Sequence, residues 1–427
     1  MQALIITIFI LGYTAIIFEH KLKVNKAGTA LVMGVLCWAA YILLSPDASE
    51  VVLHQLNEQM SDISSVLFFL LGAMTIVEVI DAHDGFRFIT DRIKTTDKRQ
   101  LFWIITFITF FLSAVLDNLT TTIVMISLLG KLLGKTEDRL IFSAMVVIAA
   151  NAGGAWTPIG DVTTTMLWIG KQITTGRIMA ELFVPSLVSA IVPLIAFSFR
   201  MKGKAVPPTE RNHGQREIKL PPALRNSIFI LGILLLLFVP VFKALTHLPP
   251  FAGMMLSLGI LWIYTGVLYH KHHGTPLKKN HLSVTSALRQ VEFSTILFFL
   301  GILLCVGSLQ HTGILSAAAG WLDRAIGNQT IIVTIIGILS AIVDNVPLVA
   351  AAQGMYDFPT DHFFWKYLAY AAGTGGSMLI IGSAAGVAAM GLQKINFIWY
   401  LKRVSFWALL GYLAGAATYI VEVKLIG

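Results

Sequence analysis

Two Asp-Asn pairs interrupt long apolar stretches of the sequence. Asp117-Asn118 and Asp344-Asn345 each follow hydrophobic residues that begin with a Ser-Ala pair. A carboxylate inside a membrane is costly unless it is compensated, so an intramembrane Asp is a candidate functional residue. The alternative is that each Asp caps the helix that it begins, a position where Asp is also favourable. The presence of the same pair in both halves of the chain favours a function.

The next apolar region in each half is broken by glycine. Residues 151–161 and 372–383 each contain a Gly-Gly pair, and the first also contains a Thr-Pro pair. Such breaks leave backbone groups free of helical hydrogen bonds, and transporters use them to hold ions near the bilayer midplane. The first break ends at Asp161, which has no acidic counterpart because Ser383 stands in the equivalent place. The alternative for Asp161 is a helix cap in front of Thr163.

Neutral oxygens surround these acids, and basic residues are rare near them. We expect Na⁺ to contact Asp117, Asp344, Asn118 and Asn345, with Asp161 as a third carboxylate. Side chains that offer further oxygens are Asn151, Thr157, Thr121, Thr122, Thr163, Ser113, Ser340, Thr374, Ser377 and Ser383. No Arg or Lys occurs in residues 101–130, 140–170, 329–365 or 367–393. A negatively charged oxygen site suits a small cation such as Na⁺ or Li⁺, and protons compete for the same carboxylates, which is sufficient for antiport.

The elements that position these residues follow from the composition. Of the 427 residues, 56% are hydrophobic and 13% are charged, about half the charged share of a soluble domain. This predicts an all-α polytopic membrane protein embedded in a lipid bilayer. The net charge of +8 is explained by basic loops in the cytoplasm, so we expect no nucleic-acid partner. Residues 1–18 are expected to be a retained first helix. The two cysteines carry no metal or disulfide pattern.

Three short motifs recur in the same order in both halves, at offsets between 222 and 230 residues. The first motif, Leu67-Phe-Phe-Leu70, matches Leu297-Phe-Phe-Leu300. The second, Ser113-Ala-Val-Leu-Asp117-Asn118, matches Ser340-Ala-Ile-Val-Asp344-Asn345. The third, the Gly153-Gly154 pair with the later Gly160, matches Gly375-Gly376 with Gly382. A duplicated unit is therefore predicted. The basic stretches are assigned to the cytoplasm. This makes the repeats inverted, with both termini outside, and gives about ten transmembrane helices plus two re-entrant hairpins.

The predicted boundaries follow from this orientation. The first repeat comprises residues 1–200, the cytoplasmic linker 201–225 and the second repeat 226–427. Each repeat contains a hairpin and a broken helix, predicted at 101–134 and 138–175 in the first and at 329–357 and 363–392 in the second. Residues 270–291 contain His270, His272 and His273, which are interpreted as part of a loop, with a metal site as the alternative.

Taken together, these motifs resemble the NhaD-type sodium/proton antiporters. The resemblance rests on the paired Asp-Asn motifs, on the stretch from Gly153 to Asp161 and on the stretch from Gly373 to Ser383, and it covers almost the whole chain. A more distant similarity extends to the wider superfamily of citrate, dicarboxylate and arsenite carriers, whose members commonly have Ser-Asn-Thr in place of Asp-Asn. The resemblance implies a homodimer in which each subunit has a scaffold and a mobile transport domain that moves as an elevator.

We therefore expect a secondary transporter of the inner (cytoplasmic) membrane that exchanges Na⁺ or Li⁺ for H⁺, with a role in pH homeostasis. It is not an enzyme, and no catalytic residue or cofactor is expected. The first alternative is a cation-coupled carrier of a small anion such as a dicarboxylate, citrate or arsenite. The second is a receptor that transports nothing, which the buried acids disfavour.

Overall fold

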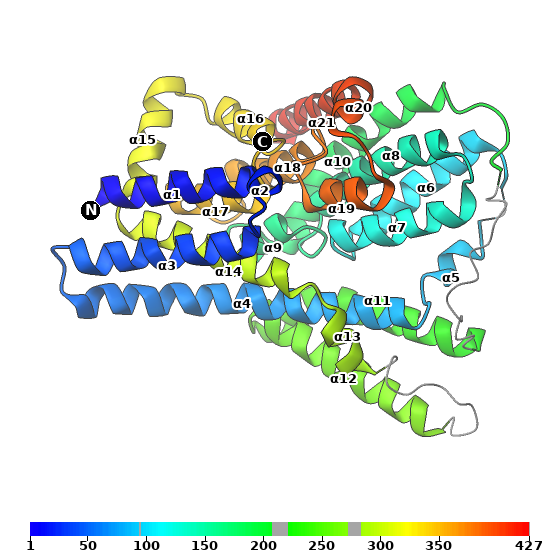
Figure 1. The fold of residues 1–427 in the computed structure, drawn as a ribbon, viewed down its shortest axis with the longest axis horizontal. Helices are drawn as coiled ribbons and strands as arrows, with labels where there is room; N and C mark the ends of the chain where they lie inside the picture. Colours follow the sequence, from blue (N-terminus) through cyan, green and yellow to red (C-terminus); the bar gives the residue numbers. More distant parts are fainter. Residues whose placement is uncertain (94, 207–220, 272–282, 427) are drawn as a thin grey trace.

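The computed structural model describes residues 1–93, 95–206, 221–271 and 283–426. Within these ranges the regular structure is helical, apart from one isolated bridge between Asp97 and Lys204. Most helices run roughly parallel to the long axis of the molecule (Figure 1). The all-α prediction is confirmed. Much of the predicted linker, and the side chains of the histidine loop at 270–273, lie outside the described residues.

Eight helices among the described residues are long and apolar enough to cross a membrane. They are α3 (Lys26–Leu44), α4 (Ser49–Ala82), α8 (Thr136–Ala155), α10 (Thr175–Ser198), α11 (Pro222–Thr246), α12 (Pro250–Lys271), α14 (Phe293–His311) and α21 (Ser405–Ile426). The apolar helices α1 (Gln2–Ile17) and α19 (Ala384–Gln393), and α18 (Phe363–Gly375) before the latter, are each shorter than 18 residues, so the number of about ten transmembrane helices stays a prediction. The chain is thus a multi-pass membrane protein.

Two helical hairpins turn back at the Asp-Asn pairs. The first consists of α6 (Lys98–Ser113) and α7 (Asn118–Leu132), and the second of α16 (Gln329–Leu339) and α17 (Asn345–Met355). In Figure 1 the first hairpin lies toward the right-hand end and the second toward the left-hand end, with the start of α9 (Val162–Ile169), α18 and α19 between them. The α15 helix (Ile314–Ile326) bends by 115° into α16. The remaining helices are single or double turns: α2 (Glu19–Leu22), α5 (Arg87–Thr90), α13 (Val284–Gln290) and α20 (Phe397–Arg403).

The α4 helix is longer than its hydrophobic segment. The apolar run begins near residue 63, but the helix begins at Ser49 and has 34 residues. Residues 49–62 contain neither Gly nor Pro, so nothing in the local sequence ends the helix. Their polar side chains Glu58 and Asp62 line a polar pocket, which explains how a hydrophilic turn continues a membrane helix.

The helices form two groups on either side of a boundary. In one group α3 packs closely on α14: a Cβ added at Gly34 would lie 2.6 Å from the carbonyl oxygen of Gly301, so only glycine permits this approach. This group also contains α1, α4, α11 and α12. The other group contains α6 to α10, α16 to α19 and α21. The groups meet where α4 contacts α9 and where α14 contacts α17.

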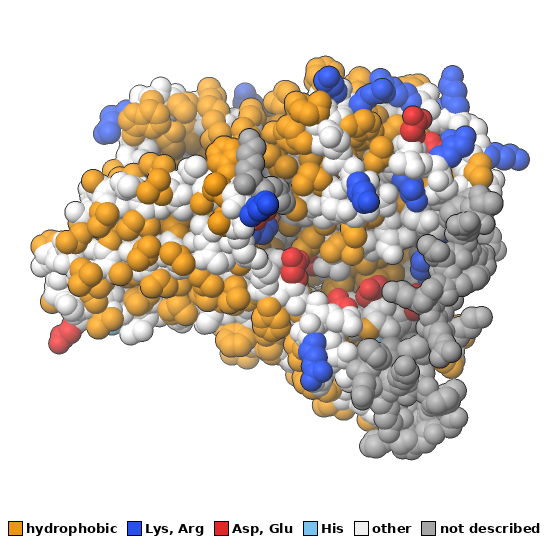
Figure 2. All heavy atoms as spheres, viewed as in Figure 1, with side chains coloured by type: hydrophobic (Ala, Val, Ile, Leu, Met, Phe, Trp, Pro, Cys, Tyr) orange, Lys and Arg blue, Asp and Glu red, His pale blue; other side chains and the backbone are white. Residues whose placement is uncertain are grey.

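The surface of the molecule is that of a membrane protein. Figure 2 shows hydrophobic side chains over the region of α1, α3 and α4, while most of the visible Lys and Arg lie toward the other end. Exposed apolar residues on these helices include Leu11, Val32 and Leu43. A monomeric soluble protein rarely exposes so large an apolar area.

Candidate functional site

Each hairpin turns on an Asp that caps its second helix. Asp117 accepts hydrogen bonds from the Thr120 backbone N–H at 2.8 Å and from the Thr120 hydroxyl at 2.5 Å. Asp344 accepts one from the Val346 backbone N–H at 3.1 Å. Both side chains are only partly buried. The capping role is thus part of the geometry in both halves.

The Thr157 side chain stabilises the break in the first crossing by two hydrogen bonds. Its hydroxyl donates to the Ala114 carbonyl at 2.6 Å and accepts from the Gly160 N–H at 3.1 Å. The bond from Thr157 to Ala114 joins the break in the crossing to the turn of the first hairpin. Asp161 then begins α9, accepting from the Thr163 N–H at 2.9 Å and the Thr163 hydroxyl at 2.8 Å.

The hairpin and the broken crossing touch in the same way in both halves. Ser113 donates its hydroxyl to the Ala150 carbonyl at 2.6 Å, and Ser340 donates to the Ala372 carbonyl at 2.9 Å. Added Cβ atoms at Gly153 and Gly375 would lie 2.1 and 2.0 Å from backbone carbonyl oxygens of the respective hairpins. These equivalent contacts are what a duplicated unit requires, although the repeat boundaries themselves remain a prediction.

Four polar side chains form one buried network across the centre of the molecule. The Asn118 side-chain nitrogen donates to Asn151 Oδ1 at 3.0 Å and to Asp161 Oδ2 at 2.9 Å. The Asn151 side-chain nitrogen donates to Ser383 Oγ at 2.9 Å. All four side chains are at most 5% exposed. The network joins the hairpin tip, both parts of the first broken crossing and the start of α19, so the two halves of the chain meet in it.

Further oxygen ligands lie beside this network. The Thr121 and Thr122 hydroxyls, one turn after Asn118 on α7, are buried without a hydrogen-bond partner among the described residues. Buried polar groups are normally paired, so these hydroxyls are candidates for binding a ligand. In the second half, Thr374 donates to the Tyr370 carbonyl and Ser377 donates to the Thr374 carbonyl, both at 2.6 Å.

The predicted residues do not all converge on one cluster of acids. No group of three or more His, Cys, Asp or Glu side chains in the described ranges could hold a metal ion alone. Asp161, rather than Asp117 or Asp344, makes the bond to Asn118. Asn345 is as buried as Asn118, yet no side-chain hydrogen bond is found for it in the described part of the chain. A cation here would depend on amide and hydroxyl oxygens as well as on a carboxylate.

No cationic side chain neutralises Asp161 in the part of the chain that the structure describes. Its partners are the neutral Asn118 and Thr163 groups. Lys366, the one basic residue in the second broken crossing, pairs with Glu181, with 2.5 Å between Nζ and Oε2. Sequence reasoning passed over this pair, because nothing in the spacing links residue 181 to residue 366. Among the described residues, the network therefore holds one acidic side chain and no basic one.

Comparison with known proteins gives consistent matches. The citrate transporter family matches residues 13–365. Sodium/proton antiporter 2 of Arabidopsis thaliana is 49% identical over 97% of this chain and 98% of its own length. Sodium/proton antiporter 1 of the same plant is 50% identical over 97% of this chain and 71% of its own length. The Na⁺/H⁺ antiporter NhaD of Alkalimonas amylolytica is 32% identical over 97% of this chain and 89% of its own length.

The chain belongs to the NhaD-type sodium/proton antiporter family. The resemblance inferred from the motifs is thereby confirmed, and so is the wider relation to citrate carriers.

Proposed function

We propose that this protein exchanges Na⁺, or Li⁺, for H⁺ across a membrane. The observation that carries the proposal is the Asn118–Asp161 contact inside a buried network that contains no cationic partner. A carboxylate whose hydrogen-bond partners are all neutral can be compensated by an alkali cation or by a proton, but not by both at once. The names of the relatives, which are sodium/proton antiporters, support the same cargo.

The exchange follows from this competition. When the cation binds, the carboxylate releases its proton. When the cation leaves on the other side, a proton restores neutrality. Asn118 positions the Asp161 carboxylate by donating to Oδ2, and the Thr163 groups hold Oδ1. Asp117 and Asp344 are proposed to contribute charge at the hairpin tips, where each of them caps a helix.

The test is Na⁺-driven proton flux in everted vesicles, measured at a series of pH values on both sides of neutrality. The apparent KM for Na⁺ should rise as the pH falls, because protonated carboxylates must lose their protons first. Asp161→Asn, Asp117→Asn and Asp344→Asn should each abolish exchange while the protein stays folded, since Asn cannot titrate. Asp47→Asn, at an exposed loop, is the matched control.

Two results would contradict the proposal. One is an apparent KM for Na⁺ that does not depend on pH. The other is uptake of labelled citrate or dicarboxylate without proton exchange, which would favour the anion-carrier alternative that the citrate transporter match raises.

We infer that alternating access is an elevator movement of the second helix group against the first. Support comes from the boundary between α4 and α9, where two cavities lie between the groups. Cross-linking cysteines at Val66 and Met166 across this boundary should stop exchange. The native Cys37 and Cys305, whose sulfur atoms are 3.5 Å apart within the first group, provide the control, because joining them leaves the boundary free.

We further propose a homodimer in the inner membrane with both termini outside. The homodimer rests on the family resemblance and is tested by the mass of the purified protein in detergent. The orientation rests on the distribution of basic residues. Cysteine labelling tests it: an impermeant reagent added outside should modify Ser49→Cys but not Lys202→Cys, and both positions are exposed.

A further inference from the structure

We propose that a polar pocket between α4, α14, α9 and α17 is the vestibule through which the cation passes between the outer side and the site. Asp62 and Glu58 are proposed to attract the cation into it. The inference rests on the proposed function and adds an access route and two residues that determine apparent affinity.

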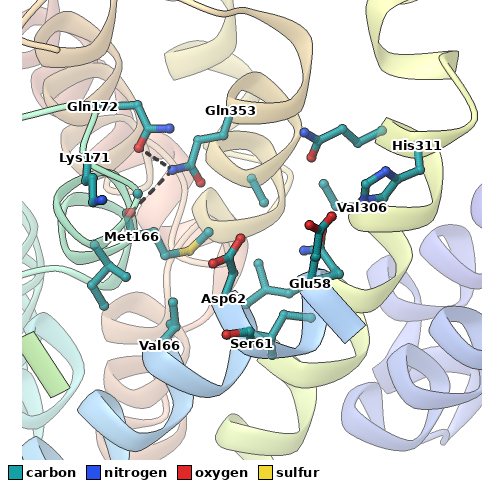
Figure 3. A pocket seen from close by; sticks show the side chains of 17 residues that line it. Glu58, Ser61, Asp62, Val66, Met166, Lys171, Gln172, Val306, His311 and Gln353 are labelled. Atoms are coloured by element: carbon teal, nitrogen blue, oxygen red, sulfur yellow. Dashed lines mark hydrogen bonds between the residues drawn. The ribbon is translucent and has the colours of Figure 1, made fainter. Parts of the chain in front are cut away.

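The pocket is large and lies on the boundary between the two helix groups. Its volume is about 630 Å³, ample for a hydrated alkali ion. Glu58 and Asp62 are four residues apart and therefore share one face of α4. Figure 3 shows both carboxylates pointing into the pocket from α4, with His311 beyond Glu58 and with Lys171, Gln172 and Gln353 on the opposite side of Asp62.

The lining of the pocket is suited to water rather than to lipid. Nine of its 17 residues are polar or charged, including Gln59, Gln310 and Gln353. The Gln353 side-chain nitrogen donates to Gln172 Oε1 at 2.9 Å, which fixes part of the wall formed by the second helix group. Acyl chains packed against these groups would leave them without hydrogen-bond partners, at a cost of free energy.

Two of the four helices around the pocket, α4 and α9, continue to the site. Beyond Asp62 on α4, Val66 lines the bottom of the pocket, and Phe69 lines a second cavity of about 50 Å³ that contains Asp117 and Asn118. On α9, Met166 lines the first cavity and Thr165 the second. On α4 the linings of the two cavities are therefore about one helical turn apart.

A thin apolar layer separates the two cavities in this conformation. Val66 and Met166 form its face toward the first cavity, and Phe69, which lines the second cavity, packs edge to face on Trp168 with the ring centroids 6.3 Å apart. One wall of this layer belongs to α4 and the other to α9, which lie in different helix groups. Relative movement of the groups would open or close the passage at this layer.

The charges of the vestibule favour cations near α4. The pocket lining contains two carboxylates on α4 and one ammonium group, that of Lys171. The Thr360 hydroxyl donates to the Lys171 carbonyl at 2.7 Å and so fixes the backbone of Lys171. Acidic walls around a cavity raise the local concentration of cations. Because the two carboxylates change the local concentration of the cation, they should alter the apparent affinity for Na⁺ and not the rate at saturating Na⁺.

The first experiment measures Na⁺-driven proton flux in proteoliposomes of uniform orientation. Asp62→Asn and Glu58→Gln should each raise the apparent KM for Na⁺ added on the vestibule side by roughly threefold. The maximal rate, and the KM on the opposite side, should not change. The increase should disappear in concentrated N-methylglucamine chloride, because salt screens exposed charges. Glu50→Gln, on the same helix but outside the pocket, is the control.

The second experiment does not need transport. Ser61→Cys places a thiol in the pocket, where a cationic methanethiosulfonate should react several times faster than an anionic one. Asp62→Asn in the same chain should reduce this preference. The unmodified protein is the control, because its two cysteines are buried.

These outcomes separate the two proposals. Unchanged KM values in both charge variants, or equal reaction rates with the two reagents, would overturn the vestibule. If the unaltered protein showed no Na⁺-driven flux, the proposed function would fail, while the reagent preference would still decide whether this pocket attracts cations.

Discussion

Replacing Asn118 by Ala should weaken Na⁺ binding far more than the same change at Asn345. The two residues occupy the same place in the paired motifs, and both are 5% exposed. Symmetry alone predicts equal effects. The structure predicts unequal ones, because the Asn118 side chain donates to Asn151 and to Asp161, whereas no such bond is found for Asn345 within the described ranges.

The size of the increase in apparent KM follows from the hydrogen bond that Asn118→Ala removes from the Asp161 carboxylate. A hydrogen bond to a charged acceptor contributes about 1.5–3 kcal/mol, and removing one partner of a buried pair exposes the full cost of the other. If the Asn118–Asp161 bond orients the carboxylate in the Na⁺-bound state, its loss corresponds to about a 10- to 150-fold higher apparent KM. Asn345→Ala should change the KM by less than about threefold, the effect of a small polar deletion without a broken bond.

The assay is the initial rate of Na⁺-driven proton flux at a fixed alkaline pH, with both variants reconstituted at equal density. Thermal unfolding in detergent shows whether a loss of exchange reflects binding or folding. Equal KM increases in the two variants, or a larger one for Asn345→Ala, would refute the reasoning from the Asn118 network.

Two further predictions concern stability. Gly153→Ala should prevent stable folding or lower the unfolding temperature strongly, because its Cβ would lie 2.1 Å from the Phe110 carbonyl oxygen. Gly130→Ala is the control and should be tolerated, because there is open space around Gly130. Thermal unfolding in detergent compares the two variants. Lys366→Met should destabilise the fold by about 1.5–3 kcal/mol, because the partly buried Glu181 carboxylate loses its closest partner and keeps only Arg177, 3.5 Å away. The double variant with Glu181→Gln should recover much of the loss, and no recovery in the same assay would mean that packing alone explains the effect.

The helical breaks could be predicted from the sequence because their causes are local. Each Asp of the Asp-Asn pairs caps a new helix, and each Gly-Gly pair lies in the last turn of a helix or at its end, just before the break, so their positions indicated the hairpins and the broken crossings. The partners of the site residues could not be predicted in this way. That Asn118 bonds to Asp161 and Asn151 depends on how three separate segments pack, and repeat symmetry suggested instead that Asp117 and Asp344 would meet.

Other features depend on contacts between distant segments. The polar start of α4 lies outside the apolar run, and the pocket that its acidic side chains line forms only when α4 packs beside α9, α14 and α17. The closeness of Cys37 and Cys305 follows from the glycine contact between α3 and α14, and neither spacing nor composition indicates it. Lys366 and Glu181 are likewise joined only by the packing of α18 on α10.

The glycine contacts between hairpins and broken crossings limit which internal motions the protein can use. Where Gly153 and Gly375 lie against backbone carbonyls, the hairpin cannot bend toward the crossing, and the serine bonds at Ser113 and Ser340 resist bending away. A hairpin that swung open as an independent flap would have to break these bonds in full. In the proposed elevator movement the helix groups slide past one another, so these bonds stay intact and both hairpin tips move together.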